Sequence, residues 1–557
     1  MALQIPQWPT AFGDFNSQLA LPLAIVAISM IATTWSYLSR RNKPSIPYLS
    51  GTIPRLSITL MYMTDMKAFL AKARSNLRQM NIVQYHLGPM KAYIVTGATN
   101  VQTMFRTSAV DCNILFLMVY ENIWAATKDD LAKWRNDKSG RSKIPTPEKH
   151  PRPENKRYWA GMHHLVATYL TRTSEAAILG QLFQKSFAQR IEQFPIGQAT
   201  TLSVYKWLLK DMAMAAVKTV NGQRILDETP NLLDLLWDFD VIVTDLLWGL
   251  PRFLNRESWR KRERFHDAVS RYMEGAIRDF DWAGVRAANP DWEPVFGSRF
   301  TREYVEWCLA CEFSLQTITG SLATLTIYGA NANSVPVTAW CIMEIAKDQA
   351  LLEAVREEVK TVFEVDEATG QKTAMNTQKL MGLPLLQSIY TEGLRLHVSM
   401  NVTRQIIGPL EMGGVKLDHG AALQAATEIS HYNEEVWGSK GHPASEFWPE
   451  RHVKYVDGEP GPDGKTERVR QFVLAGGPND FFPYGGGLAI CPGRFFAKQE
   501  IMLTIAMFVS RFDIVPVGWV NMDGTPSDRP AKDDARWSGG ASVPPDRDLK
   551  VTLKRLW

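Results

Sequence analysis

The chain has 557 residues, of which 45% are hydrophobic and 22% are charged. This composition excludes an intrinsically disordered chain, a collagen-like fibre and a membrane protein with many spans. The 62 basic and 58 acidic residues leave a net charge of only +4, which gives no electrostatic basis for nucleic-acid binding. The five cysteines are too widely spaced for a disulfide framework, so the sequence indicates a reducing compartment.

Near the N-terminus, residues 19–38 form an uncharged apolar stretch, LALPLAIVAISMIATTWSYL, and Arg40, Arg41 and Lys43 follow it directly. About 20 helical residues span the hydrocarbon core of a bilayer, so this stretch predicts a transmembrane signal anchor. A cleavable signal peptide is the alternative, but no Lys or Arg precedes the apolar stretch. The basic residues after it predict a cytosolic body.

The anchor divides the chain into four expected segments. Residues 1–18 would be a short lumenal N-terminus, 39–56 a basic and Pro-rich hinge, and 57–557 the catalytic domain. A protein with this organisation is expected in the endoplasmic reticulum membrane as a single-pass protein.

Beyond the hinge, apolar residues at three- and four-residue spacing predict helices over residues 200–280, 301–350 and 378–397. Residues 404–424 predict a hairpin that turns at Gly413-Gly414, and the polar residues 456–465 predict an exposed loop. The expected fold is therefore mainly α with a minor β region.

The residues that could take part in a reaction concentrate around Cys491, in FFPYGGGLAICPGRFFAKQE. A Gly-rich loop lets backbone N–H groups approach one sulfur closely, and the helix that follows adds its positive N-terminal end. Both effects favour a thiolate of low pKa, which is the proximal ligand that a haem iron needs to activate oxygen. A buried structural cysteine beside a glycine turn is the alternative.

This stretch resembles the haem-binding signature of the cytochrome P-450 family, F-x-x-G-x-x-x-C-x-G, with Gly487, Cys491 and Gly493 in register. Two positions depart from the family pattern. Tyr484 stands where phenylalanine is usual, and Ala489 stands where an arginine or histidine usually binds a haem propionate. The resemblance implies that Cys491 is the axial ligand of the iron in haem b.

A second match lies upstream, in YTEGLRLH and FWPERH. Glu392 and Arg395 are three residues apart and so share one helix face. They resemble the E-x-x-R pair of the family, and Arg451 matches the arginine of its F-x-P-x-R segment. A carboxylate between two guanidinium groups can accept bidentate, charge-assisted bonds, so the implied role of these three residues is structural.

The resemblance also implies contacts to the haem propionates. Arg404 lies nine residues after Arg395, at the spacing of a propionate-binding arginine. Trp159 matches the tryptophan of the W-x-x-x-R helix and could donate its indole N–H. His163 occupies the arginine position of that motif, and its alternative interpretation is an ordinary surface histidine.

The central helix of the family usually carries an acid and an alcohol above the iron. In residues 328–336, Ala332 replaces the acid and Asn333 replaces the alcohol, while Ser334 retains a hydroxyl one residue later. The asparagine alternatively bonds a backbone carbonyl, and Pro336 should kink the helix. This pattern resembles the branch that contains cholesterol 7α-hydroxylase, sterol 12α-hydroxylase and prostacyclin synthase.

The resemblance implies a membrane-anchored monooxygenase that oxidises a lipophilic sterol, terpenoid or polycyclic substrate, in secondary metabolism. No flavin or nicotinamide fingerprint is present, so electrons from NADPH would arrive through NADPH–cytochrome P-450 reductase, with cytochrome b5 as a further partner. Two alternatives stay open. One is an O₂-independent isomerase or dehydratase of an oxygenated lipid, and the other is a haem carrier without catalytic activity.

Overall fold

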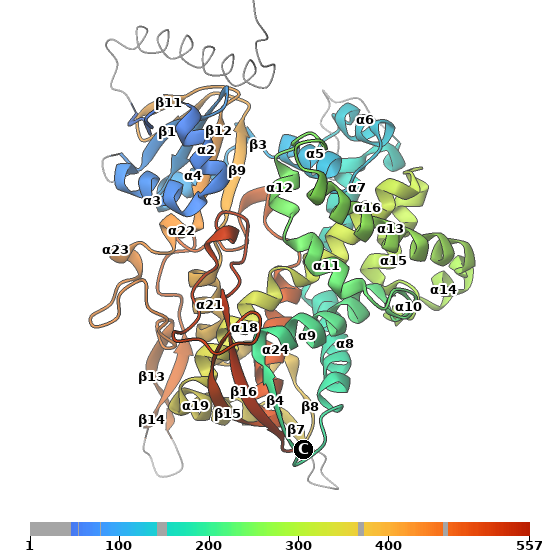
Figure 1. Cartoon of the computed structure of the whole chain (residues 1–557), viewed down its shortest axis with the longest axis vertical. Coiled ribbons are helices and arrows are strands. Elements are labelled where there is room, and N and C mark those ends of the chain that lie inside the picture. The colour runs from blue at the N-terminus through green and yellow to red at the C-terminus, as the bar shows by residue number, and fades with distance from the viewer. Residues whose placement is uncertain (1–45, 54, 78–79, 142–152, 366–371, 461–465) are drawn as a thin grey trace, which may run out of the picture.

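The computed structural model describes residues 46–53, 55–77, 80–141, 153–365, 372–460 and 466–557 (Figure 1). Helices dominate, and small sheets lie at two sides of the helical body. The prediction of a mainly α fold with a minor β region is therefore confirmed.

A sheet of five strands forms one end of the molecule, together with three short helices (Figure 1). In spatial order the strands are β1 (Ile82–Leu87), β2 (Met90–Val95), β12 (Ala422–Ala426), β9 (Asn401–Ile406) and β3 (Val110–Asp111). The helices are α2 (Leu56–Thr64), α3 (Met66–Leu77) and α4 (Ala98–Arg106). The sheet joins the first part of the chain to residues beyond 400, because β12 pairs in parallel with β2.

The first half of the helical body packs around a core rich in aromatic side chains. Its helices are α5 (Asn113–Asn122), α6 (Lys128–Asn136), η1 (Glu154–Lys156), α7 (Tyr158–Tyr169), α8 (Thr173–Ile191), α9 (Val204–Asn221), α10 (Arg224–Glu228), α11 (Leu232–Asp240), α12 (Val243–Leu247), α13 (Arg256–Asp279), α14 (Trp282–Ala288) and α15 (Arg299–Ala310).

The second half of the body surrounds the loop of Cys491. Its helices are α16 (Leu315–Leu322), the π-helical segment η2 (Ala323–Tyr328), α17 (Gly329–Asn331), α18 (Ser334–Ala346), α19 (Gln349–Lys360), α20 (Thr377–Gly382), α21 (Pro384–His397), α22 (Thr427–Ser430), α23 (Glu434–Trp437), η3 (Gly487–Ala489), α24 (Arg494–Arg511) and η4 (Ala535–Trp537). Helices α8, α9, α18, α21 and α24 share the largest apolar core, which fixes the start of α24.

The remaining strands form a three-stranded sheet and four hairpins. The sheet has the order β15 (Phe512–Asn521), β16 (Arg547–Arg555) and β4 (Ala199–Ser203). The hairpins pair β5 (Trp292–Glu293) with β6 (Gly297–Ser298), β7 (Phe363–Val365) with β8 (Lys372–Met375), β10 (Leu410–Met412) with β11 (Val415–Leu417), and β13 (Val453–Pro460) with β14 (Thr466–Phe472).

The three predicted helical regions are mostly helical, but each is divided, and the first begins in strand β4, which ends at Ser203. The region 301–350 breaks at residues 311–314 and again at Ala332 and Asn333, three residues before Pro336, which was expected to kink it. The N–H groups of the first helical turn have no partner within the helix, so a proline, which lacks an N–H, fits there without loss of a bond. Helix α18 accordingly begins just before Pro336.

The two β predictions have different outcomes. The turn at Gly413-Gly414 is confirmed, because both glycines have positive φ angles of 57° and 76° between β10 and β11. The predicted loop 456–465 is wrong in its first half, because residues up to Pro460 continue strand β13, which pairs with β14. Pairing of Val456 with Val469 and of Asp457 with Arg468 of β14 carries the strand into these polar residues.

The predicted anchor, residues 19–38, and the short lumenal segment lie outside the described residues. Within the described ranges, none of the helices has both the length and the apolar character needed to cross a membrane. The expected hinge 39–56 is described only from residue 46. There, backbone bonds join Pro47 and Leu49 to Gln84 of β1, so this part of the segment is fixed to the sheet.

Candidate active site

The loop before Cys491 is held in one conformation by its glycines. The Cys491 N–H donates to the Tyr484 carbonyl over 2.9 Å, which closes the loop. Gly485 and Gly487 have φ angles of 71° and 65°, a region that disfavours side chains. A Cβ at Gly487 would also overlap the carbonyl oxygen of Phe105, so glycine is required there for two independent reasons.

The thiol of Cys491 lies just before the N-terminus of α24. Burial raises the pKa of this thiol, and the backbone N–H groups of Gly493 and Arg494 oppose the rise. The expectation of a net lowered pKa is therefore wrong, because the cost of burying a charge exceeds the effect of the nearby donors. A thiolate here needs a metal cation as its counter-charge.

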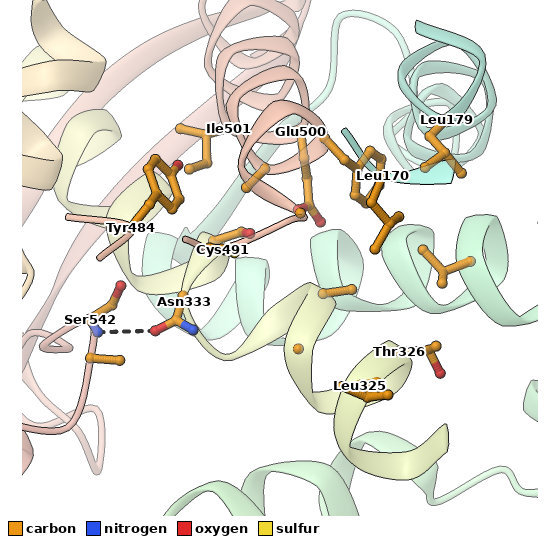
Figure 2. A pocket seen from close by; sticks show the side chains of 18 of the residues that line it. Leu170, Leu179, Leu325, Thr326, Asn333, Tyr484, Cys491, Glu500, Ile501 and Ser542 are labelled. Atoms are coloured by element: carbon orange, nitrogen blue, oxygen red, sulfur yellow. Dashed lines mark hydrogen bonds between the residues drawn. The ribbon is translucent and has the colours of Figure 1, made fainter. Parts of the chain in front are cut away.

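A cavity opens beside this thiol, and its empty space, including the part open to solvent, is about 990 Å³. Its wall is mostly apolar and comes from α8, α9, β6, α15, η2, α17, α18, α21 and α24, together with Leu170 just after α7 (Figure 2). Gly329 and Ala330 line it, so the absence of large side chains on α17 keeps that wall open. The cavity therefore joins the Cys491 loop to the broken central helix.

The break in the central helix directs Asn333 and Ser334 into this cavity, whereas Ala332 is buried and does not line it. The amide oxygen Oδ1 of Asn333 accepts a bond from the backbone N–H of Ser542 over 3.0 Å (Figure 2). That bond fixes the amide orientation and leaves the Nδ2 group as a donor. Asn333 thus offers the cavity a donor, and not both a donor and an acceptor.

A buried ion cluster lies on the far side of α21. Arg395 donates from Nε to Glu392 Oε1 over 2.6 Å and from a second nitrogen to Oε2 over 2.9 Å. Arg451 Nε donates to Oε2 over 3.1 Å, and His452 Nε2 lies 3.2 Å from Oε1. The three predicted residues meet as expected, and none of them lines the cavity.

Every member of this cluster is also tied to backbone. Arg395 donates to the carbonyls of His431 and Ala444, and Arg451 donates to those of Pro443 and Glu446. Burial alone would raise the pKa of the Glu392 carboxyl, but bonds from Arg395 and His452 lower it to about 2. The carboxylate therefore stays charged and joins α21 to the segment before β13.

The three residues expected to bind the haem propionates lie in different surroundings. Arg404 is buried and donates to the carbonyls of Thr403 and Gly486, next to the Cys491 loop. The indole N–H of Trp159 donates to the Trp134 carbonyl over 3.1 Å, so its expected bond to a propionate is replaced by one within the protein. His163 is exposed, which agrees with the interpretation as a surface histidine.

Arg141 is a residue that the sequence motifs did not indicate. Its guanidinium lies 5.2 Å above the Trp159 ring. Burial lowers the pKa of Arg404 and of His163, and the positive charge of Arg141 adds to both shifts. The charges of Arg141 and Arg404 therefore interact, and Arg404 lies against Gly486 of the Cys491 loop, an arrangement that favours an anion there. The only signal in the sequence was the absence of arginine at residues 163 and 489.

These residues fit a haem. The wall supplies one thiol with backbone donors and an apolar cavity, and the guanidinium groups of buried Arg404 and partly buried Arg141 outside that wall suit two carboxylates. Among the described residues there is no cluster of three or more His, Cys, Asp or Glu that could hold a bare metal ion. The donor set thus suits an iron that already carries its own equatorial ligands.

Comparison with known proteins agrees with this geometry. The sequence model of the cytochrome P-450 family matches residues 78–523. The cytochrome P-450 monooxygenase calL of Penicillium decumbens is 41% identical over 98% of this chain and 99% of its own length. The cytochrome P-450 monooxygenase efuG of Hormonema carpetanum is 24% identical over 91% of this chain and 92% of its own length. The 7-alpha-hydroxycholest-4-en-3-one 12-alpha-hydroxylase of Homo sapiens is 27% identical over 41% of this chain and 44% of its own length.

Proposed function

Because the chain belongs to the cytochrome P-450 family, we propose that it oxidises a lipophilic sterol, terpenoid or polycyclic substrate of secondary metabolism. The chain is a cytochrome P-450 monooxygenase, and it uses haem with electrons that come from NADPH through a reductase. The substrate class, the membrane anchor and the roles of individual residues are the parts that we propose.

The observation that carries the proposal is the position of the Cys491 thiol in the wall of an apolar cavity. Side chains such as Leu170, Val220 and Leu325 leave few polar partners for a charged substrate. The name of the 12-alpha-hydroxylase of Homo sapiens contains a steroid, 7-alpha-hydroxycholest-4-en-3-one. The similarity to this enzyme supports a sterol-like substrate class. Shape and lining together favour a large apolar molecule with few hydrogen-bonding groups.

In this proposal Cys491 ligates the haem iron, and the N–H groups of Gly493 and Arg494 stabilise the thiolate. Arg404 and Arg141 bind the propionates, while Glu392, Arg395 and Arg451 hold the fold beneath them. The haem supplies the reductive activation of O₂. Asn333 contributes one amide donor, which can hold an oxygen atom in place but has no proton to give up at neutral pH.

The test couples the full-length protein to a P-450 reductase in membranes and screens sterol and terpenoid panels with isotopically labelled O₂. We expect a product that requires NADPH and carries one labelled oxygen. Addition of cytochrome b5 tests whether it assists the transfer of electrons. Conversion of an oxygenated lipid without NADPH and without label would contradict the proposal and favour the isomerase or dehydratase alternative.

The membrane anchor has its own test. Deletion of residues 1–39 should move much of the protein from the membrane fraction to the soluble fraction, while the haem spectrum persists. Unchanged membrane association after this deletion would contradict residues 19–38 as the principal anchor.

A further inference from the structure

Residues 533–545, the wall segment, lie between strands β15 and β16 and form part of the cavity, yet the proposed function gives them no role. Ala541 and Ser542 of this segment line the cavity, and the Ser542 N–H holds the Asn333 amide (Figure 2). The segment contains the short helix η4 and otherwise only isolated β-bridges. Without a ladder of backbone bonds, its position depends on contacts with the neighbouring helices.

His397, the last residue of α21, contacts the first residue of the wall segment. Its Nδ1 lies 2.7 Å from Oδ1 of Asp533, and only 11% of the His397 side chain is exposed. One face of the ring stacks on the indole of Trp340 in α18, with 4.0 Å between the ring centroids and 5° between the planes. An imidazole is flat and carries nitrogen atoms at its edge, so a single side chain makes both contacts.

The same two residues also hold the other end of the wall segment. The indole Nε1 of Trp340 donates to the Val543 carbonyl over 2.9 Å, and the Val543 N–H donates to the His397 carbonyl over 2.8 Å. An isolated bridge pairs Asp533 with Pro545. Both ends of the segment therefore meet at the C-terminal end of α21, beside the His397 ring.

Ser399 fixes the register of the segment at the cavity. Its N–H donates to the Ala541 carbonyl over 2.8 Å, and its hydroxyl oxygen accepts from the Gly539 N–H over 2.8 Å. This register places the Ser542 N–H against Oδ1 of Asn333, 3.0 Å away. A shift of the segment would therefore change the cavity wall and the Asn333 amide together.

We propose that His397 is a positioning residue for this part of the cavity wall. Its ring, held between Asp533 and Trp340, keeps the wall segment against α21. The segment in turn sets the places of Ala541 and Ser542. The inference rests on the proposed function, because a bulky apolar substrate fills the cavity and its fit depends on this wall. A small ligand leaves the wall untouched and should be insensitive to His397.

Three variants separate the two contacts of the ring. His397→Phe keeps the stack on Trp340 and loses the bond to Asp533, whereas His397→Gln keeps a polar group and loses the stack. His397→Ala loses both. The matched control is His442→Ala, because His442 also stacks on an indole, with 4.2 Å between the centroids, and lies 3.2 Å from a carboxylate oxygen. His442 does not line the cavity.

The first test follows the wall segment directly and requires no turnover. Hydrogen exchange of the purified holoenzyme should show the amides of residues 539–543 exchanging roughly tenfold faster in His397→Ala than in the wild type. His397→Phe and His397→Gln should lie between the two, and His442→Ala should match the wild type. Unchanged exchange in His397→Ala would overturn the inference. Faster exchange throughout the helical body would overturn it as well, because His397 would then stabilise the fold in general.

The second test measures the consequence for the cavity. Imidazole and clotrimazole, an imidazole that carries three aromatic rings, both bind haem iron through nitrogen, so titrations of the Soret band give a Kd for each. A loosened wall no longer offers preorganised contacts to the aromatic rings. Clotrimazole should therefore bind about three- to tenfold more weakly to His397→Ala than to the wild type, while the Kd of imidazole stays the same.

The control and the contradicting outcomes are distinct from those of the proposed function. His442→Ala should bind both azoles like the wild type, and His397→Phe should recover part of the clotrimazole affinity. An equal change in both Kd values, or no change in either, would overturn the role of His397. A wild type that oxidises none of the sterols and terpenoids would instead contradict the proposed function, and exchange and azole binding would still decide the role of His397.

Discussion

Glu392 and Glu500 are both completely buried carboxyl groups, yet their pKa values shift in opposite directions. The pKa of Glu392 falls to about 2 because Arg395, Arg451 and His452 surround it. The pKa of Glu500 rises to about 8 because burial acts with little opposition. The comparison shows that burial alone does not set the charge of an acid, and that the number of donors around it does.

The hydrogen bonding around the two acids differs as their pKa values do. Around Glu392, the guanidinium groups donate to backbone carbonyls as well as to the carboxylate, so removal of one group leaves several others without partners. On the helices that carry the cavity side, Thr504 Oγ1 of α24 and Asn331 Oδ1 of α17 are buried and have no partner among the described residues. The π-helical segment η2 precedes this region, and such segments are frequent at functional sites. The first region therefore satisfies its buried polar groups, whereas the second leaves several of them without partners among the described residues.

The largest effect should come from the cavity side, through Cys491→His. Replacement of the thiol by an imidazole removes the proposed thiolate ligand, so the long-wavelength Soret band of the reduced carbon monoxide complex should disappear. The reduced, carbon-monoxide difference spectrum measures this directly. A persistent thiolate-type band would place the ligand on another cysteine. Cys341→Ser is the control, because Cys341 is buried outside the cavity.

The next largest effect should come from the ion cluster, through Glu392→Ala. It leaves two buried guanidinium groups without their carboxylate, which should lower the free energy of unfolding by about 3–5 kcal/mol and reduce haem content. Thermal unfolding and the haem-to-protein ratio measure the two effects. Glu357→Ala is the matched control, because Glu357 pairs with Lys360 at the same three-residue spacing but on the surface. It should cause little change. Equal melting temperatures for the two variants would show that the buried cluster does not stabilise the fold.

The sequence predicted the ion cluster well because its residue types and spacing carry the geometry. Glu392 and Arg395 share a helix face by periodicity alone, and the resemblance supplied Arg451. His452 was missed although it directly follows Arg451, because a histidine in a motif does not reveal whether its ring faces inward. The mainly α fold and the hairpin at Gly413-Gly414 were predictable for similar local reasons.

The cavity side was predicted less completely, because its properties depend on contacts between distant segments. The bond from Ser542 to Asn333 joins residues 209 positions apart, and no local pattern indicates it. The contact of Arg141 with Trp159 joins segments that are closer in the chain, but no motif indicates it either. Glu500 lay within the stretch around Cys491, but only the structure shows that its carboxyl group is fully buried and has no ion pair among the described residues.

The two acids should also impose opposite pH dependences on stability. Glu392 has a lowered pKa, so its contribution is present above its ordinary value of 4.5 and is lost as the pH falls towards 2. Glu500 has a raised pKa, so its contribution is present below 4.5 and is lost as the pH rises towards 8. Relative to Glu500→Gln, the wild type should lose up to about 1.4 kcal/mol of stability per pH unit across that interval.

Unfolding in denaturant at several pH values between 5 and 8 measures this difference. Thr504→Val should stay parallel to the wild type, since it removes no titratable group. Parallel curves for the wild type and Glu500→Gln would mean that the carboxyl is already charged at neutral pH, which would make the two acids alike.

The smallest effect on stability should come from Asn333. Its amide oxygen is bonded to the Ser542 N–H and its Nδ2 group faces the cavity, so variants can separate a structural role from an orienting role. Asn333→Asp keeps an oxygen that accepts the Ser542 N–H, so it should retain nearly all of the stability while it loses the Nδ2 donor. Asn333→Ala loses both and leaves the Ser542 N–H without its partner, which should cost about 1–3 kcal/mol.

If the donor orients an oxygen atom in the cavity, both variants should release more peroxide per NADPH than the wild type, because proton delivery from the Ser334 side then meets a poorly placed acceptor. If Asn333 serves only as a tether between α18 and the segment of Ser542, Asn333→Asp should match the wild type in peroxide yield and Asn333→Ala alone should differ. Melting temperature and peroxide yield, measured on the same preparations, separate the two roles.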